Sequence, residues 1–175
     1  MKQVKKDLRE KMVFVGGARQ VGKTTLARHI LGARTKGYLN WDVPKQRECI
    51  LKGEWPSADL WVLDEIHKYP KWKNLLKGYY DQWQGKIRFI VTGSARLDLF
   101  RKSGDSLVGR YFLFRMLPLG IREVVSALPR NSVEWFPGEE LRSIPLASAP
   151  WSEALESLLH LTGYPEPFGV GKEDF

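Results

Sequence analysis

The fold of this chain is decided by the stretch Gly16-Gly17-Ala18-Arg19-Gln20-Val21-Gly22-Lys23-Thr24-Thr25. It contains the pattern G-x-x-x-x-G-K-T. A short apolar run over residues 11–15 precedes it and predicts a buried strand. Residues 24–31 predict a helix that stops at Gly32. Strand, glycine loop and helix, in this order, are the context in which the pattern forms a phosphate-binding P-loop.

The composition of this loop suits a bound phosphate chain. Gly17 and Gly22 permit a tight turn that exposes backbone N–H groups, because glycine has no Cβ to block the approach. These groups and the positive end of the following helix attract phosphate oxygens. We expect Lys23 to reach the β- and γ-phosphates and the Thr24 hydroxyl to coordinate Mg²⁺. The predicted nucleotide-binding residues are Gly17, Ala18, Arg19, Gln20, Val21, Gly22, Lys23, Thr24 and Thr25.

Composition sets broad limits on the partners. The 175 residues fit one domain, or one domain with part of a second. The net charge of +8 is compatible with nucleotide, nucleic acid or a membrane surface, and does not choose among them. The single cysteine, Cys49, excludes an internal disulfide framework. A charged N-terminus without an apolar signal segment, and no apolar run of about 18 residues, lead us to expect a cytoplasmic protein that does not enter membranes.

A second candidate site follows the apolar run at residues 60–63, where Asp64 and Glu65 stand side by side. A continuous apolar strand is typical of a sheet that is buried on both faces. The carboxyl ends of such strands are where open α/β sheets bind ligands. We therefore interpret the pair as a Walker B motif, in which Asp64 holds Mg²⁺ through water and Glu65 orients or deprotonates the attacking water.

Two further positions complete the predicted catalytic set. Residues 86–95 predict a strand with small polar residues at its end, and either Thr92 or Ser94 is placed to sense the γ-phosphate; we favour Ser94. Arg110 stands just before another predicted strand. An arginine there can project towards a γ-phosphate, in the same molecule or in a neighbour, and raise the rate by about 10³–10⁵. The predicted catalytic residues are Lys23, Glu65, Ser94 and Arg110.

The remaining segments alternate between predicted strands and helices. A strand is predicted over 35–42, and helices are predicted over 2–10, 43–52, 72–83, 97–107 and 151–161. The intervening residues 126–150 hold several prolines and show no clear period.

Taken together, the chain resembles the AAA-like P-loop ATPases of bacteria and archaea, in the branch often followed by a C-terminal domain of unknown function. The motifs that match are Gly17–Thr24, Leu63–Lys68, Val91–Ser94, Leu107–Arg110, Leu117–Leu119 with Glu123, and Gly163–Pro167. The resemblance covers about residues 8–168. It departs from the family at His67, where a glutamine is more common.

This resemblance implies a three-layer α/β fold. Its parallel five-stranded sheet has the order 5-1-4-3-2, with helices on both faces, and it carries a Mg²⁺-ATP site and hydrolyses ATP. On this basis residues 1–125 are expected to form the ATPase core. Residues 126–175 are expected to form an incomplete lid, or a linker to a missing C-terminal domain. The expected function is an ATPase whose nucleotide state switches a protein partner, another copy of the chain or a downstream domain.

Other functions fit parts of the pattern. A nucleotide-binding interaction module with little turnover needs only the P-loop. A helicase would match Asp64-Glu65-Ile66-His67, but the interval from Lys23 is short for that class and a second motor domain is missing. A small-molecule kinase usually lacks the glutamate after the strand-end aspartate. Nucleic-acid binding is suggested by the net charge and the basic N-terminus.

Overall fold

The computed structural model describes residues 2–33, 35–54, 58–83, 86–94, 107–121, 123–124 and 149–165. The chain divides into two compact units, residues 1–116 and 117–175. The helix predicted over 97–107 falls, except for Leu107, outside the described residues, as does the aperiodic stretch 126–148.

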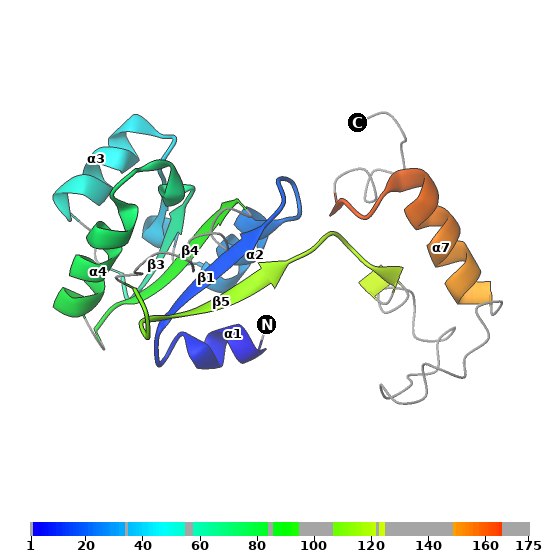
Figure 1. Ribbon diagram of the computed structural model, residues 1–175, viewed down its shortest axis with the longest axis horizontal. Coiled ribbons are helices and arrows are strands. Elements are labelled where there is room, and N and C mark those ends of the chain that lie inside the picture. The colour runs from blue at the N-terminus through cyan, green and yellow to red at the C-terminus, as the bar shows by residue number, and fades with distance from the viewer. Residues whose placement is uncertain are drawn as a thin grey trace. The chain divides into compact units, whose positions relative to one another are not determined.

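The first unit is built on a five-stranded parallel sheet in the order β2-β3-β4-β1-β5 (Figure 1). The strands are β1 (Met12–Gly17), β2 (Tyr38–Asn40), β3 (Leu60–Asp64), β4 (Arg88–Ser94) and β5 (Tyr111–Met116). Counted from β5 instead of β2, the order is 5-1-4-3-2, so the predicted fold class is confirmed. The register pairs Gly17 with Ser94 and Asp64 with Thr92, and thereby gathers the predicted polar residues at one edge of the sheet.

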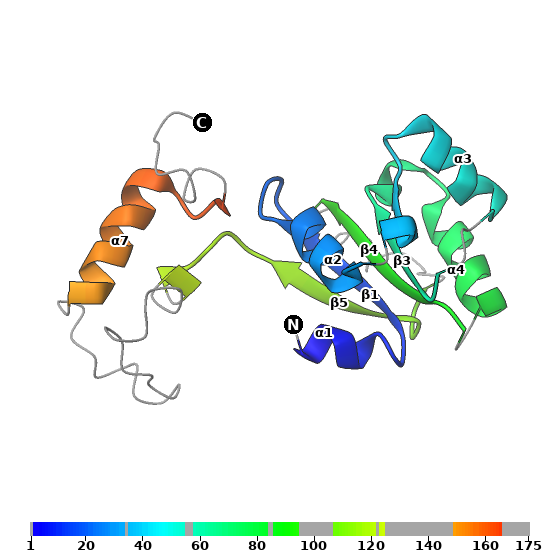
Figure 2. The same ribbon diagram turned by 180° about the vertical axis from the view of Figure 1, so that it is seen from behind.

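Helices cover both faces of this sheet (Figures 1 and 2). One face packs against α1 (Lys2–Asp7) and α2 (Lys23–Leu31), and the other against α3 (Pro44–Lys52) and α4 (Trp72–Trp83). Two short 3₁₀ turns, η1 (Thr35–Gly37) and η2 (Ile66–Lys68), precede β2 and follow β3. The strand predicted over 35–42 is therefore shorter than expected, because its first residues form η1.

The central strand shows why its sequence is apolar at successive positions. Phe14 packs in the core beneath α3 and α4, whereas Val13 and Val15 pack in the core beneath α2. All three side chains are at most 2% exposed. Side chains alternate between the faces of a strand, so a strand covered on both sides has no position left for a polar residue. This burial fixes β1, and with it the start of the glycine loop.

The second unit contains α7 (Ala149–Leu161). Ala154 of this helix and Val124 are buried together. The N–H of Leu119 donates to the carbonyl of Gly163 at 2.6 Å, and a Cβ on Gly163 would collide with the Leu119 carbonyl. The predicted role of residues 126–175 as lid or linker stays a prediction. No helix within the described ranges has the length and apolar character needed to cross a membrane.

Gly17 is expected to be irreplaceable for packing. A Cβ at this position would collide with the backbone carbonyl of Met116 in β5, so Gly17→Ala should lower the free energy of unfolding by about 1–3 kcal/mol. Gly78 in α4 is the matched control, because no described atom lies within 4 Å of a Cβ built there. Gly78→Ala should be neutral or stabilise by up to about 1 kcal/mol. Urea denaturation measures both; equal effects would contradict the packing account.

Candidate nucleotide-binding site

The predicted nucleotide-binding residues 17–25 form the end of β1, a five-residue loop at 18–22 and the first turn of α2. Gln20 and Gly22 have φ values of 61° and 90°, in the left-handed region. Turns of this kind direct successive N–H groups towards one concave point. Gly22 is the N-cap of α2 and has no side chain with which to cap the first helical turn. The loop and the helix start therefore offer N–H donors to an anion.

Lys23 lies over this loop. Its side chain is only 8% exposed, and Nζ donates to the carbonyl of Gly17 at 3.2 Å and to that of Ala18. Burial lowers the pKa of Lys23, and the negative charges of Glu65 and Asp64 oppose that shift. The two backbone carbonyls hold the ammonium group at the mouth of the loop. Its contact with the β- and γ-phosphates stays a prediction.

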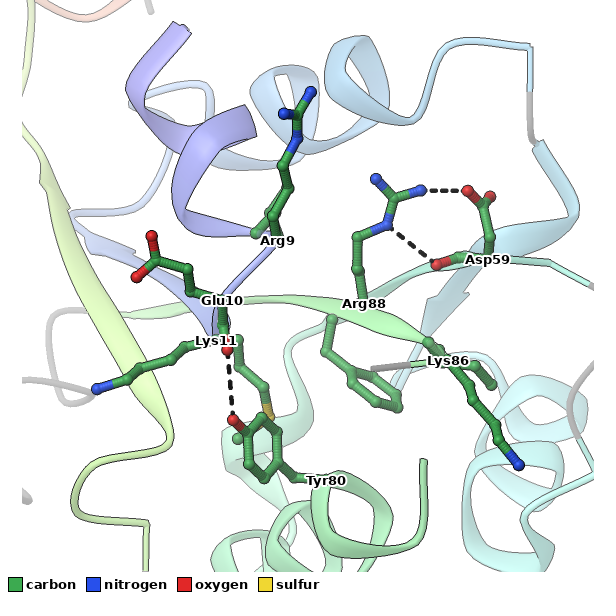
Figure 3. A pocket seen from close by; sticks show the side chains of 11 residues that line it. Arg9, Glu10, Lys11, Asp59, Tyr80, Lys86 and Arg88 are labelled. Carbon is green, nitrogen blue, oxygen red and sulfur yellow. Dashed lines mark hydrogen bonds and ion pairs between the residues drawn. The ribbon is translucent and has the colours of Figure 1, made fainter. Parts of the chain in front are cut away.

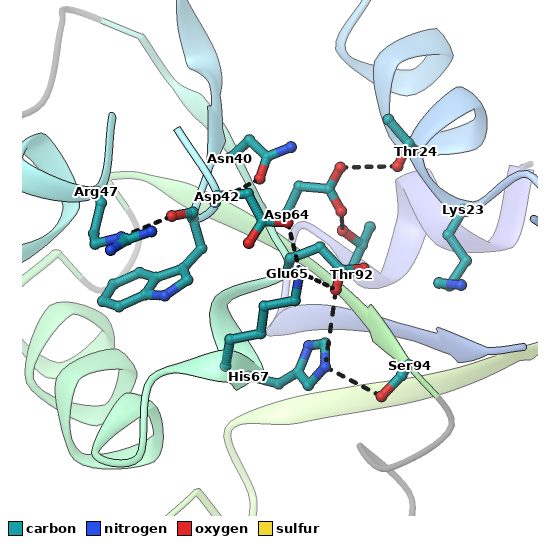
Figure 4. Close-up of polar contacts among 12 residues, drawn as sticks. Lys23, Thr24, Asn40, Asp42, Arg47, Asp64, Glu65, His67, Thr92 and Ser94 are labelled. Atoms are coloured by element: carbon teal, nitrogen blue, oxygen red, sulfur yellow. Dashed lines mark hydrogen bonds and ion pairs between the residues drawn. The ribbon is translucent and has the colours of Figure 1, made fainter. Parts of the chain in front are cut away.

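Asp64 is the most enclosed charged group of the site, at 2% exposure. Oδ2 accepts hydrogen bonds from the Thr24 hydroxyl at 2.8 Å and from the Tyr38 hydroxyl at 2.6 Å. Oδ1 accepts one from the Thr92 hydroxyl. Asp64 at the end of β3 therefore contacts α2, β2 and β4 at once. Figure 4 shows Asp64 with Thr24 and Thr92.

Tyr38 was not predicted as a member of the site. Its hydroxyl is part-buried beside Asp64, and burial, the hydrogen bond and the aspartate charge raise the pKa of Tyr38 to about 12. The Arg28 guanidinium lies 4.4 Å from the centre of the Tyr38 ring. The tyrosine is therefore a neutral donor to Asp64 at physiological pH.

Glu65 has a strained backbone. Its φ of 59° and ψ of 17° lie in the left-handed region, which is unfavourable for a residue with a Cβ. The Glu65 N–H donates to the Thr92 carbonyl at 3.2 Å, which ties this turn to β4. Oε2 of Glu65 lies 3.5 Å from Lys68 Nζ, and Lys68 also pairs with Asp42 at 2.5 Å. The carboxylate predicted to activate water is thus held beside the 3₁₀ turn η2.

Ser94 and His67 meet at the end of β4. Ser94 is opposite Gly17 in the register, next to the loop, and its Oγ lies 3.1 Å from His67 Nε2. Thr92 donates its hydroxyl to Asp64, whereas the Ser94 hydroxyl lies beside His67. The role of Ser94 as the sensor of the γ-phosphate stays a prediction.

Arg110 does not join these residues. It precedes β5 at the opposite edge of the sheet, where its carbonyl accepts from the Met12 N–H at 3.1 Å. Its guanidinium contacts the Asp81 carboxylate in α4 at 2.9 and 3.3 Å. The length of β1, about 16 Å for five residue steps, separates Arg110 from the glycine loop. The arrangement does not support a role for Arg110 at the nucleotide of its own molecule; a role at a neighbour's nucleotide stays a prediction.

A family model described as an AAA domain matches residues 9–125, more than half of the chain. The chain belongs to this AAA-domain family. The matched range contains the glycine loop, the adjacent carboxylates Asp64 and Glu65, and the end of β4.

Relatives of this AAA domain include two uncharacterized proteins, one from Mycobacterium bovis and one from Mycobacterium tuberculosis. Each is 29% identical over 125 residues, a match that covers 68% of this chain and 28% of the relative. The match thus spans little more than a quarter of the length of these curated relatives.

Two solved structures share the fold. The RuvB Holliday junction branch migration motor of Thermotoga maritima is 19% identical with a TM-score of 0.55, covering 96% of this chain and 59% of that one. A STAND signal transduction ATPase with a tetratricopeptide repeat sensor, from Pyrococcus horikoshii, is 17% identical with a TM-score of 0.52, covering 94% of this chain and 28% of that one. At these identities the similarity shows the fold alone.

The donor set of the AAA domain fits magnesium. No group of three or more His, Cys, Asp or Glu side chains suited to a metal ion occurs among the described residues. Thr24 and Asp64 instead provide hard oxygen atoms next to the loop. Mg²⁺ is commonly bound by one or two carboxylates together with substrate phosphates and water, so these two residues would hold it beside a bound nucleotide.

A cavity lies at the opposite edge of the sheet, away from the glycine loop. It has a volume of about 530 Å³, and its lining includes Arg9, Lys11, Lys86 and Arg88 (Figure 3). Arg88 pairs with Asp59, and the side chains of Lys11 and Lys86 point away from one another. These cations do not converge on one point, so the glycine loop is the stronger anion site.

The imidazole of His67 should make stability depend on pH. Burial lowers the pKa of His67 below its ordinary 6.5; Glu65 and Asp42 oppose the shift, while Lys68 and Lys23 add to it. On acidification the unfolded chain takes up the proton first. The contribution of neutral His67 to the free energy of unfolding is therefore complete above pH 6.5, and it is lost as the pH falls through the lower pKa of His67 in the folded state.

Denaturation at pH 7.5 and 5.5 measures this dependence. The free energy of unfolding should fall more for the wild type than for His67→Gln, which has no imidazole to protonate at this position. The exposed His29 and His160 are present in both proteins and cancel in the comparison. An equal fall in the two proteins would show that His67 is not the group responsible.

Proposed function

We propose that this AAA domain binds Mg²⁺-ATP, hydrolyses it, and uses its nucleotide state to switch a partner or a downstream domain. The observation that carries the proposal is a convergence at one edge of the sheet. The ends of β1, β3 and β4 place Lys23, Asp64, Glu65 and Ser94 around a glycine loop, with Thr24 hydrogen-bonded to Asp64. Phosphoryl transfer depends mainly on positioning and on charge stabilisation, and these residues supply both.

Each residue has a distinct task in this proposal. The loop N–H groups and Lys23 hold the β- and γ-phosphates, and Ser94 donates to a γ-phosphate oxygen. Glu65 orients the attacking water and takes its proton. Thr24 and Asp64 would hold Mg²⁺, which neutralises charge on the phosphate oxygens when it is bound.

A nucleotide-binding module with little turnover is the second candidate. The position of Arg110 favours this candidate, because Arg110 lies away from the glycine loop of its own molecule and contacts Asp81 instead. If a neighbouring copy supplies Arg110, an isolated molecule binds ATP but turns it over slowly. The two candidates therefore differ in how hydrolysis depends on protein concentration.

Partners beyond the nucleotide are proposals. The mycobacterial relatives are longer than the matched region, so a downstream domain is one candidate for the switched element. Nucleic-acid binding rests on the net charge of +8. It is also in keeping with the fold shared with a branch migration motor. A cytoplasmic location rests on the sequence pattern alone.

Substitutions at Lys23 and Glu65 should separate binding from hydrolysis. Lys23→Ala removes the cation at the phosphates and should weaken ATP binding by about a hundredfold or more, measured by calorimetry. Glu65→Gln should still bind ATP but release phosphate about 10²–10⁴ times more slowly. The exposed pair Lys45→Ala and Glu48→Gln in α3 are matched controls that should change neither. Tight ATP binding by Lys23→Ala would refute the assignment of the loop.

Arg110 is tested by complementation between copies. Arg110→Ala should lower phosphate release by about 10³-fold or more if a neighbour's nucleotide needs it. Mixing it with Lys23→Ala, which binds ATP weakly but retains Arg110, should restore part of the activity. Arg88→Ala is the control, because Arg88 is also an ion-paired arginine at this edge of the sheet. Unchanged turnover in Arg110→Ala would remove the neighbour hypothesis.

A further inference from the structure

His67 lies between two groups that the proposed function gives different tasks. Its Nε2 is 3.1 Å from the Ser94 hydroxyl oxygen and 3.9 Å from Oε2 of Glu65 (Figure 4). The side chain is 10% exposed. A nearly buried imidazole that faces both the phosphate-sensing hydroxyl and the water-activating carboxylate can affect the two together.

The hydrogen on this imidazole has a preferred position. A neutral ring carries one N–H, on Nδ1 or on Nε2. Nδ1 is buried and has no hydrogen-bond partner within the described part of the chain. A hydrogen there would be a buried donor without an acceptor, whereas a hydrogen on Nε2 has Ser94 Oγ as acceptor. The nearby Glu65 carboxylate also favours N–H over a lone pair on Nε2.

We propose that His67 is a positioning residue whose Nε2–H donates to Ser94 Oγ and so leaves the Ser94 hydroxyl hydrogen free for the terminal phosphate of a bound nucleotide. This inference rests on the proposed function, because that function is what brings the terminal phosphate of a nucleotide to Ser94. In the opposite tautomer Ser94 would donate to Nε2 and present only lone pairs to an anion. His67 therefore makes Ser94 a donor towards phosphate.

The same nitrogen also links Ser94 to Glu65. When Ser94 donates to a phosphate oxygen, its own oxygen becomes a stronger acceptor, which keeps the Nε2–H on Ser94. Glu65 then retains its ion pair with Lys68 and a free lone pair for water. Because Nε2 lies 3.1 Å from Ser94 Oγ and 3.9 Å from Oε2 of Glu65, the hydrogen on Nε2 serves Ser94 and leaves the Glu65 carboxylate available to water.

The tautomer is tested directly by nitrogen-15 NMR of the full chain labelled at histidine. The chain has three histidines, and the exposed His29 and His160 serve as internal references. The signal that disappears in His67→Gln identifies His67. At pH 7.5 we expect a neutral ring with the hydrogen on Nε2. A hydrogen on Nδ1, or a doubly protonated ring, would overturn the proposal whether or not the protein hydrolyses ATP.

The link to phosphate is tested by the preference for a non-hydrolysable ATP analogue over ADP, measured by calorimetry. Ser94→Ala and His67→Leu should each reduce the preference about tenfold, and the double variant should lose no more than either single one. His67→Gln should retain most of it, because a glutamine amide can donate from a similar position. The matched control His29→Ala should equal the wild type.

The outcomes show whether a failure concerns the role of His67 or the proposed nucleotide-binding function on which that role rests. If the wild type prefers the ATP analogue and His67→Leu keeps that preference, the inference alone is wrong. If the wild type binds neither nucleotide, the proposed function is wrong and the inference falls with it. Additive losses in the double variant would show that His67 and Ser94 act separately, and would also overturn the proposal.

Discussion

The buried carboxylate of Asp64 is the constraint on which the rest of the site depends. An ionised carboxylate at 2% exposure is costly unless hydrogen-bond donors replace the water that it has lost. Three hydroxyls do so, from Thr24, Tyr38 and Thr92. These donors come from α2, β2 and β4, so satisfying one charge fixes how a helix and two strands lie around the end of β3.

This requirement connects the sheet to the chemistry. The order β2-β3-β4-β1 places β3 between the two strands that donate to Asp64, and places β4 next to the strand that leads into the glycine loop. With Asp64 fixed, the next residue, Glu65, turns through the left-handed region and enters η2. The strain at Glu65 is offset by its backbone bond to Thr92 and by the ion pair with Lys68. The carboxylate that we propose as base is therefore held by the fold rather than by a mobile loop.

Local patterns in the sequence predicted the glycine loop and the pair Asp64 and Glu65, whereas the layers and the strand order were predicted through the resemblance to AAA-like ATPases. A glycine loop between a buried strand and a helix, and two carboxylates after an apolar run, have few other arrangements. Tyr38 escaped prediction because its role depends on the pairing of β2 with β3, which places Asn40 beside Asp64 and Tyr38 two residues before it. Nothing in its neighbourhood in the sequence marks it as a donor to a distant carboxylate.

For Arg110 the sequence suggested a role, but the place of this residue in the fold was not evident from the sequence. Its position before a strand was visible in the sequence, but parallel strands all begin at the edge of the sheet away from the loop, and there it meets Asp81. At the other edge of the sheet, Asp64 and Thr24 would hold magnesium beside a nucleotide. Titration of the wild-type chain with a non-hydrolysable ATP analogue, with Mg²⁺ and then with a chelator in its place, tests this most directly. The account predicts clearly tighter binding with Mg²⁺, and equal affinity under the two conditions would contradict it.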